Sequence, residues 1–138
     1  MSVALHNAPR GVADASPAAE TSGRGMQMRV FAYGTLRDPK VFARVAGTAL
    51  PLDRALPAIL PGFRRVVLRG TPYPTLLRDP GAETDGLLLA VGALVLRRLH
   101  AYEGPAYRFR PVHVTVGSVR IPAHAWISPH ADPETDWP

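Results

Sequence analysis

At 138 residues the chain is long enough for one domain with a single core, and 46% of its residues are hydrophobic. It has no cysteine, which excludes disulfides and thiolate chemistry, and no apolar run in the sequence is long enough to span a membrane. The formal net charge is +5, but the fifteen arginines are scattered, without the basic runs or interleaved aromatic residues typical of nucleic-acid binding. An acidic small molecule suits this charge equally well.

The chain begins with residues 1–27, which are small, polar and without periodicity, and we expect a disordered N-terminal extension there. The first ten residues lack the charged start and apolar centre of a signal peptide, so a cytoplasmic protein is expected. Met28–Tyr33 is a short apolar run that suits a buried strand. After a turn, Asp38 followed by proline predicts a helix that ends at Gly47.

The middle of the chain predicts several short strands and a second helix. Leu50–Gly70 is apolar but interrupted by prolines, which indicates irregular strands with bulges. Residues 75–77 form a brief strand that Asp79-Pro80-Gly81 ends in a turn, and Asp85–Val91 forms another strand. Gly92–Glu103 has the spacing of a short helix.

The last part of the chain predicts a β-hairpin. Tyr107–Val116 and Val119–Ile127 are rich in β-forming residues, and a Gly-Ser pair joins them tightly. Pro122 would place the second strand at an edge of the sheet. Residues 130–138 are expected to be an acidic C-terminal tail. The fold class expected for residues 28–129 is therefore α+β, a small mixed β-barrel with about two flanking helices.

Glu103 is a carboxylate where a folding argument predicts an apolar residue. It continues the apolar stripe of Leu96 and Leu99 along one face of the helix, just before a Gly-Pro stop. A negative charge at this end of a helix also meets the negative end of the helix dipole, at a cost of roughly 0.3–1 kcal/mol when exposed. If buried, the carboxyl would have a raised pKa and could act as a general base.

The alternative for Glu103 is a carboxylate that reaches the surface from a frayed last turn, or one paired with an arginine. Arg97, Arg98 and Arg108 are the candidate partners. The pattern of residues alone supports this structural role and the chemical role equally.

Tyr33-Gly34-Thr35-Leu36 is a second candidate for chemistry. A turn from a strand into a helix presents unpaired backbone N–H groups, and glycine lets a ligand approach the backbone closely. A carboxylate or an oxyanion could bind there. The four residues alone favour an ordinary strand-to-helix connection, since a glycine in such a turn is common.

Metal and cofactor sites are not expected from the sequence. The histidines lack metal-ligand spacing, no nucleophilic serine motif occurs, and there is no phosphate loop or dinucleotide fingerprint. The residues considered for these roles are His6, His100, His113, His124, His130, Ser118 and Ser128. His100, which lies beside the Glu103 stripe, is expected to be solvated.

Three motifs, considered together, resemble those of a known protein family. They are Phe31-Ala-Tyr-Gly-Thr-Leu36, Tyr73-Pro-Thr-Leu76 and Leu99-His-Ala-Tyr-Glu-Gly-Pro-Ala-Tyr107. In order and spacing, residues 28–127 resemble the gamma-glutamylcyclotransferase-like superfamily. The family fold, a small β-barrel with flanking helices, agrees with the fold expected from the pattern of elements.

The resemblance implies roles for particular residues. The turn of that family holds the gamma-glutamyl end of the substrate, which corresponds to Tyr33, Gly34, Thr35 and Leu36. The glutamate of the Tyr-Glu-Gly segment is the acid/base, which corresponds to Glu103, and Tyr107 resembles a position lining the pocket. The implied reaction is attack of the substrate α-amine on its own gamma-glutamyl carbonyl, which releases 5-oxoproline without a metal or cofactor.

Two departures from the family pattern leave the gamma-glutamyl substrate unidentified. His100 stands where the family often has aspartate, and Gly86-Leu87 stands where it often has Gly-Glu. Two further functions stay open: a non-catalytic domain that binds a small acid or amide in the same pocket, and an anion- or nucleic-acid-binding protein. The sequence does not indicate an oligomeric state.

Overall fold

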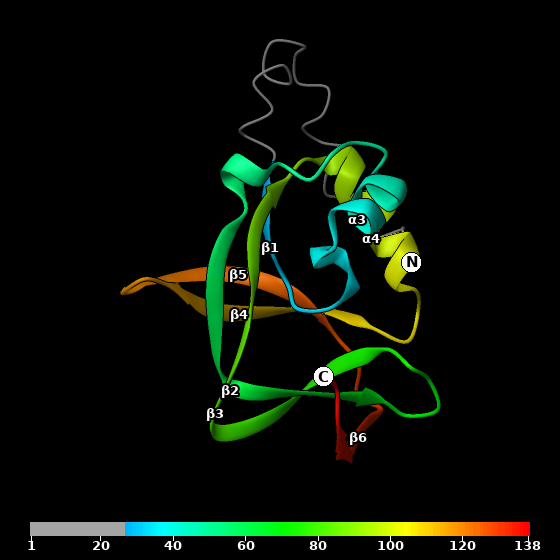
Figure 1. The fold of residues 1–138 in the computed structure, drawn as a ribbon, viewed down its shortest axis with the longest axis vertical. Helices are drawn as coiled ribbons and strands as arrows, with labels where there is room; N and C mark the ends of the chain where they lie inside the picture. The colour runs from blue at the N-terminus through cyan, green and yellow to red at the C-terminus, as the bar shows by residue number, and fades with distance from the viewer. Residues whose placement is uncertain (1–26) are drawn as a thin grey trace.

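The computed structural model describes residues 27–138, which form a small mixed β-barrel with two α-helices outside it (Figure 1). The strands are β1 (Met28–Ala32), β2 (Leu56–Leu68), β3 (Pro74–Val91), β4 (Arg108–Val116), β5 (Val119–Ile127) and β6 (Ala131–Asp136). Five of them follow the order β3-β1-β5-β4-β2, a further pairing of β3 with β2 closes the ring, and β6 pairs with β2 outside it. Neighbours in the ring are antiparallel except β1 and β5, which are parallel. The α+β barrel predicted from the sequence is confirmed.

The helices α3 (Pro39–Ala46) and α4 (Ala93–Glu103) pack against each other outside the barrel (Figure 1). Asp38 caps α3 by accepting the Lys40 N–H, and Gly47 ends the helix in the left-handed conformation with φ 79°. The predicted start and end of this helix are therefore confirmed. Two short 3-10 helices, η2 (Thr35–Arg37) and η3 (Leu52–Arg54), precede and follow α3.

The prediction that Asp79-Pro80-Gly81 ends a strand is wrong, because β3 continues from Pro74 to Val91. The register between β2 and β3 shifts between Pro61 and Phe63, as the predicted bulges require. Gly81 has φ 96°, so the chain can bulge here and then resume its pairing. Figure 1 shows both strands turning sharply at this level, which gives the long hairpin a second arm outside the barrel.

The strand β5 lies between β1 and β4, so the prediction that Pro122 marks an edge strand is wrong. Pro122 pairs with His113 of β4, and β1 meets β5 two residues further along, at His124 opposite Val30. The missing N–H of proline is therefore tolerated in a strand with two neighbours. The docking of β1 leaves no pattern in the sequence of β5 itself.

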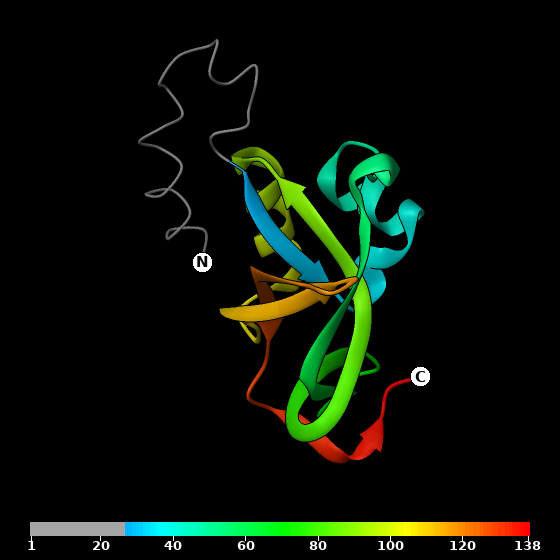
Figure 2. The same cartoon turned by 90° about the vertical axis from the view of Figure 1, so that its left-hand side faces the viewer.

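The segment expected as an acidic tail forms the strand β6, which pairs antiparallel with β2. Asp136 accepts from Arg64 at 2.7 Å, and the Trp137 indole donates to the Pro72 carbonyl at 2.9 Å. β6 lies at the far end of the molecule from the helices (Figure 2). The expected N-terminal extension lies almost entirely outside the described residues.

Two hydrophobic clusters meet at β1, because neighbouring side chains of a strand point to opposite faces. Val30 and Ala32 belong to a cluster that joins the barrel to the helices, with Phe42, Leu89, Leu99 and Trp126 among its members. Phe31 and Tyr33 belong to the cluster inside the barrel, with Leu60, Leu88, Val114 and Ala125 among its members. Among residues 27–138 no helix is long and apolar enough to cross a membrane.

Replacing Gly86 with alanine is expected to destabilise the fold. A Cβ there would lie 2.4 Å from the Ala32 carbonyl oxygen and 2.7 Å from the Phe31 ring, so β1 and β3 must separate. Overpacking of this kind costs about 1–3 kcal/mol in the free energy of unfolding. Urea denaturation measures the loss, with Gly92→Ser as the control, because a side chain at Gly92 meets nothing within 4 Å. Equal stability of Gly86→Ala and the wild type would contradict the prediction.

Candidate active site

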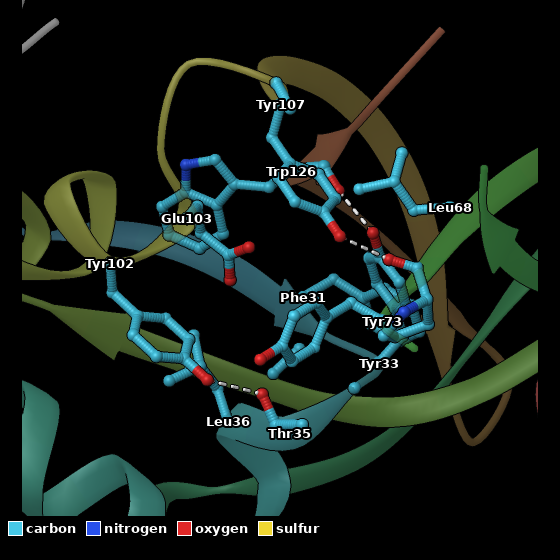
Figure 3. A pocket seen from close by; sticks show the side chains of 14 residues that line it. Phe31, Tyr33, Thr35, Leu36, Leu68, Tyr73, Tyr102, Glu103, Tyr107 and Trp126 are labelled. Atoms are coloured by element: carbon cyan, nitrogen blue, oxygen red, sulfur yellow. Dashed lines mark hydrogen bonds between the residues drawn. The ribbon is translucent and has the colours of Figure 1, made fainter. Parts of the chain in front are cut away.

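A cavity of about 280 Å³ lies between the end of β1, the turn into η2 and the last turn of α4 (Figure 3). It is lined by all the residues that the sequence singled out for the site, namely Tyr33, Gly34, Thr35, Leu36, Glu103 and Tyr107. The other lining residues are Phe31, Ala32, Leu68, Tyr73, Pro74, Tyr102, Ala106 and Trp126. Segments far apart in the sequence therefore meet around one space.

Glu103 occupies the C-terminal residue of α4, and its carboxylate points into the cavity (Figure 3). Leu99, one turn earlier, is completely buried, so the apolar stripe of α4 carries Glu103 toward the interior. Burial raises the pKa of Glu103 from 4.5 to about 7. At neutral pH this carboxyl can therefore both accept and donate a proton.

The proposed arginine partners of Glu103 are not found with it. Within the described part of the chain, no ion pair includes Glu103. Arg98 instead donates to the Ala46 carbonyl at 2.8 Å, which joins α4 to α3. The geometry therefore disfavours the alternative in which Glu103 serves only as half of a surface ion pair.

The turn after β1 has a fixed orientation. The Gly34 carbonyl accepts from both the backbone N–H and the side-chain Nε of Arg37, each at 3.1 Å, and the Thr35 carbonyl accepts from the Asp38 N–H at 3.0 Å. In a trans peptide the C=O and the following N–H point in opposite directions. The N–H groups of Thr35 and Leu36 therefore point away from these donors, and both residues line the cavity. Such N–H groups suit a carboxylate or an oxyanion.

Gly34 is required by a close approach to the first residue of β3. A Cβ on Gly34 would lie 2.8 Å from the Cγ of Pro74, closer than real Cβ atoms come. Pro74 is held in turn by its carbonyl, which accepts from the Tyr107 hydroxyl at 2.6 Å. The turn, the start of β3 and the segment after α4 therefore contact one another at the cavity.

All four tyrosines of the chain line this cavity. The buried Tyr33 donates its hydroxyl to the Trp126 carbonyl at 2.5 Å, and the Tyr102 hydroxyl lies 2.8 Å from Thr35 Oγ1 (Figure 3). Burial, followed by the nearby Glu103, raises the pKa of Tyr33 and of Tyr107. The phenols of Tyr33 and Tyr107 therefore stay protonated at neutral pH and can donate hydrogen bonds.

A charged cluster that the sequence did not predict supports the turn from outside the cavity. Arg37 lies 3.9 Å from Asp85, and Arg65 lies 3.3 Å from the same carboxylate. Arg65 also donates to the Asp85 carbonyl. Two cations with one anion leave a net positive charge beside the turn, which favours an anionic ligand there. Because these three residues come from η2, β2 and β3, no spacing in the sequence links them.

The sequence does not predict the contact between Trp126 and His100. Trp126 belongs to the predicted hairpin, but nothing in the sequence indicates that it lines the cavity, where it is 4% exposed. The expectation that His100 is solvated is wrong: its Nδ1 accepts from the Trp126 indole N–H at 3.0 Å, and its ring meets Phe109 edge-on at 4.7 Å. Helical spacing places His100 on a face but does not show that β5 covers it. In residues 27–138 no three side chains of the metal-binding types are grouped as a metal site.

Replacing Glu103 with glutamine is expected to stabilise the protein above neutral pH. Below about pH 4.5 the carboxyl is protonated in both folded and unfolded chains, so it does not change the free energy of unfolding. From there to about pH 7 it ionises first in the unfolded chain, which lowers the stability of the wild type as pH rises. Above about pH 7 the loss is complete, at up to about 3 kcal/mol.

Urea denaturation at about pH 5 and about pH 8 tests this expectation. The advantage of Glu103→Gln over the wild type should grow between the two values. The exposed Glu83, replaced by glutamine, is the control and should show no comparable change. An advantage of Glu103→Gln that does not grow with pH would mean that Glu103 is well hydrated in the folded protein.

A comparison with known families gives a match over most of the chain. The model of the family described as gamma-glutamyl cyclotransferase, AIG2-like, matches residues 30–138. The chain is 35% identical over 117 residues to AIG2-like protein A of Arabidopsis thaliana, which covers 76% of this chain and 64% of that relative. The chain thus spans slightly less than two thirds of this curated relative.

Solved structures share the fold. A solution structure of an Arabidopsis thaliana protein has a TM-score of 0.68 and 28% identity, and the match covers 80% of this chain and 74% of that one. A structure described as gamma-glutamyl cyclotransferase has a TM-score of 0.66 and covers 77% of this chain and 69% of its own, with an identity of 18% that shows the fold alone. Since the family model matches residues 30–138, the chain belongs to the gamma-glutamyl cyclotransferase, AIG2-like family.

Proposed function

We propose that the protein is a gamma-glutamyl cyclotransferase that releases 5-oxoproline and an amine from a small gamma-glutamyl compound. The observation that carries this proposal is Glu103, whose pKa is about 7, in the same cavity as the Tyr33–Leu36 turn. An acid/base and a site for an anion are what the reaction needs. The family membership of the chain supports the same reaction class.

The proposed reaction is intramolecular. The substrate α-amine attacks its own side-chain carbonyl carbon, and the new C–N bond closes a five-membered lactam. The proton lost by the attacking nitrogen goes to the carboxylate of Glu103. The bond from the same carbon to the leaving nitrogen then breaks, and Glu103 returns the proton to the departing amine. Holding the bent conformer in the cavity supplies several kcal/mol, because effective molarities of such reactions are large.

The Tyr33–Leu36 turn would bind the negatively charged part of the substrate while Glu103 transfers the proton. The N–H groups of Thr35 and Leu36 would hold the substrate α-carboxylate or the carbonyl oxygen as it gains negative charge. Arg37 keeps the Gly34 carbonyl turned away from the cavity, at 3.1 Å from its Nε, and so maintains the direction of the neighbouring N–H. This chemistry requires no metal, no nucleotide and no covalent intermediate.

Glu103→Gln is expected to lower kcat by a factor of about 10² to 10⁴, the usual contribution of a general acid/base, while substrate binding is retained. In the wild type, kcat/KM should rise with pH through about 7 as Glu103 ionises. The measurement is release of 5-oxoproline from gamma-glutamyl amines, gamma-glutamyl dipeptides and glutathione. Full activity in Glu103→Gln would contradict the mechanism. Ligand binding by the wild type without turnover of any compound would favour the non-catalytic binding domain instead.

The leaving group is proposed to be an amine without a carboxylate, so that the part of it beyond the leaving nitrogen is neutral or positively charged. In the part of the chain that the structure describes, the cavity is lined by aromatic and apolar side chains with Glu103 as its charged group, and no arginine, lysine or histidine lines it. A carboxylate on the leaving group would therefore be desolvated without a partner and would face Glu103. An unpaired polar group of this kind costs about 1–3 kcal/mol, and more when it is charged.

A matched pair of substrates tests this preference. Gamma-glutamyl-propylamide and gamma-glutamyl-2-aminobutyrate differ only in the α-carboxylate of the leaving group. The kcat/KM for the propylamide is expected to be at least about tenfold higher, which corresponds to about 1.4 kcal/mol. A preference for the aminobutyrate compound would require a cation at the site. The test leaves the Glu103 mechanism unaffected, because both substrates close the same ring.

A further inference from the structure

His100 and Trp126 form a hydrogen bond between α4 and β5. The Trp126 indole Nε1–H donates to His100 Nδ1 at 3.0 Å. Trp126 is almost fully buried, so its N–H has little access to water. An indole N–H can only donate, and a buried donor left without an acceptor costs free energy. The imidazole therefore satisfies a group that the fold has removed from solvent.

Trp126 contacts the site in two further ways. Its side chain lines the same cavity as Glu103 (Figure 3), and its carbonyl accepts the Tyr33 hydroxyl at 2.5 Å. A shift of Trp126 would thus change the wall around Glu103 and release the buried Tyr33 phenol. The position of one residue on β5 determines the shape of the cavity on two sides.

His100 lies three residues before Glu103, so the two share a face of α4. The bond to Trp126 consequently fastens the last turn of the helix, which carries Glu103, to the barrel. The Leu96 and Leu99 contacts fix α4 one turn further back, where both side chains are buried. This hydrogen bond joins the last turn of α4 to β5, whereas that of Tyr102 with Thr35 joins it to η2.

The surroundings of His100 favour a neutral imidazole. Phe109 of β4 meets its ring edge-on at 4.7 Å, Trp126 of β5 does so at 5.3 Å, and His124 of β5 stacks on Phe109 at 4.7 Å. Burial lowers the pKa of both histidines. Only a neutral ring with an unprotonated Nδ1 can accept the indole N–H. Tyr33 and Tyr107 are the groups whose pKa is raised by burial and then by Glu103, and Arg97 and Arg98 are the other charged side chains of α4 itself.

We propose that His100 is a positioning residue which, by accepting the Trp126 indole N–H, fixes the cavity wall beside Glu103 and so limits the access of water to its carboxylate. It touches no substrate and acts through Trp126. Its effect on turnover rests on the proposed function, whereas its effect on Trp126 and on the ionisation of Glu103 does not. A role in packing alone would require only an apolar side chain of suitable size at this position.

Two substitutions separate these roles. His100→Asn places an amide oxygen near the position of Nδ1 and keeps the acceptor, whereas His100→Leu keeps much of the bulk and removes it. NMR of the indole N–H groups reports on the bond, and Trp126→Phe assigns the Trp126 signal against that of Trp137. Carbon-13 NMR of side-chain carboxyls follows the ionisation of Glu103, which Glu103→Gln assigns. Neither measurement needs turnover.

The expected result is a shifted Trp126 indole signal in His100→Leu and a signal close to that of the wild type in His100→Asn. The Glu103 titration midpoint should stay near pH 7 in the wild type and in His100→Asn, and fall by at least about one unit in His100→Leu, because water reaches the carboxylate. An unchanged midpoint in a folded His100→Leu would overturn the proposal. A midpoint that falls equally in both variants would overturn it as well.

Kinetics add a readout specific to positioning. In His100→Leu kcat should fall by about tenfold or more, because a small displacement of a reacting group slows the reaction strongly. In His100→Asn, which keeps the acceptor, kcat should stay close to that of the wild type. If His100→Leu does not fold, Trp126→Phe removes the donor of the same hydrogen bond. The titration midpoint of Glu103 should then fall in Trp126→Phe as well. Absence of that shift would overturn the proposal. A wild type without turnover would refute the proposed function, while the two NMR measurements would still decide the role of His100.

Discussion

The partial desolvation of Glu103 is the constraint on which the rest of the site depends. The helix α4 ends against the barrel, so its last residue lines the cavity and is only partly exposed. A carboxylate at that end of a helix also faces the negative end of the helix dipole. Both effects oppose ionisation, and no arginine in the described residues is close enough to relieve them by an ion pair. The fold thus tolerates a locally unfavourable group, as proteins do where reactivity outweighs stability.

The barrel makes this possible because the cavity lies where its two hydrophobic clusters meet. Phe31 and Tyr33 reach the cavity from the barrel interior, while Ala32 and Trp126 reach it from the side that packs on the helices. Side chains alternate between the two faces of β1, and residues of both clusters line the cavity at the end of this strand. A rearrangement of either cluster would therefore alter the cavity. The shape of the site depends on the packing of both clusters and not on the turn alone.

Much of the fold could be predicted because its signals are local. The Asp38-Pro39 cap, the Gly47 stop and the stripe that leads to Glu103 are written in neighbouring residues. The errors concern partners distant in the sequence. The bulge at Gly81, the second neighbour of Pro122 and the pairing of β6 depend on which strands dock beside them. The same limit explains the site: the turn and Glu103 lie in recognisable motifs, whereas Trp126 and the Arg37–Asp85 pair become part of it only through folding.

Because all four tyrosines of the chain line one cavity, the phenol groups of the protein can serve as site-specific probes of that cavity. When a reagent nitrates or iodinates phenols, every tyrosine that it modifies lies around the cavity of Glu103. Tyr73 and Tyr102 are the accessible members at its mouth, since 52% and 39% of their surfaces are exposed, whereas Tyr33 is shielded at 6%. Fluorotyrosine incorporated throughout would likewise give a fluorine spectrum whose every signal comes from this one place.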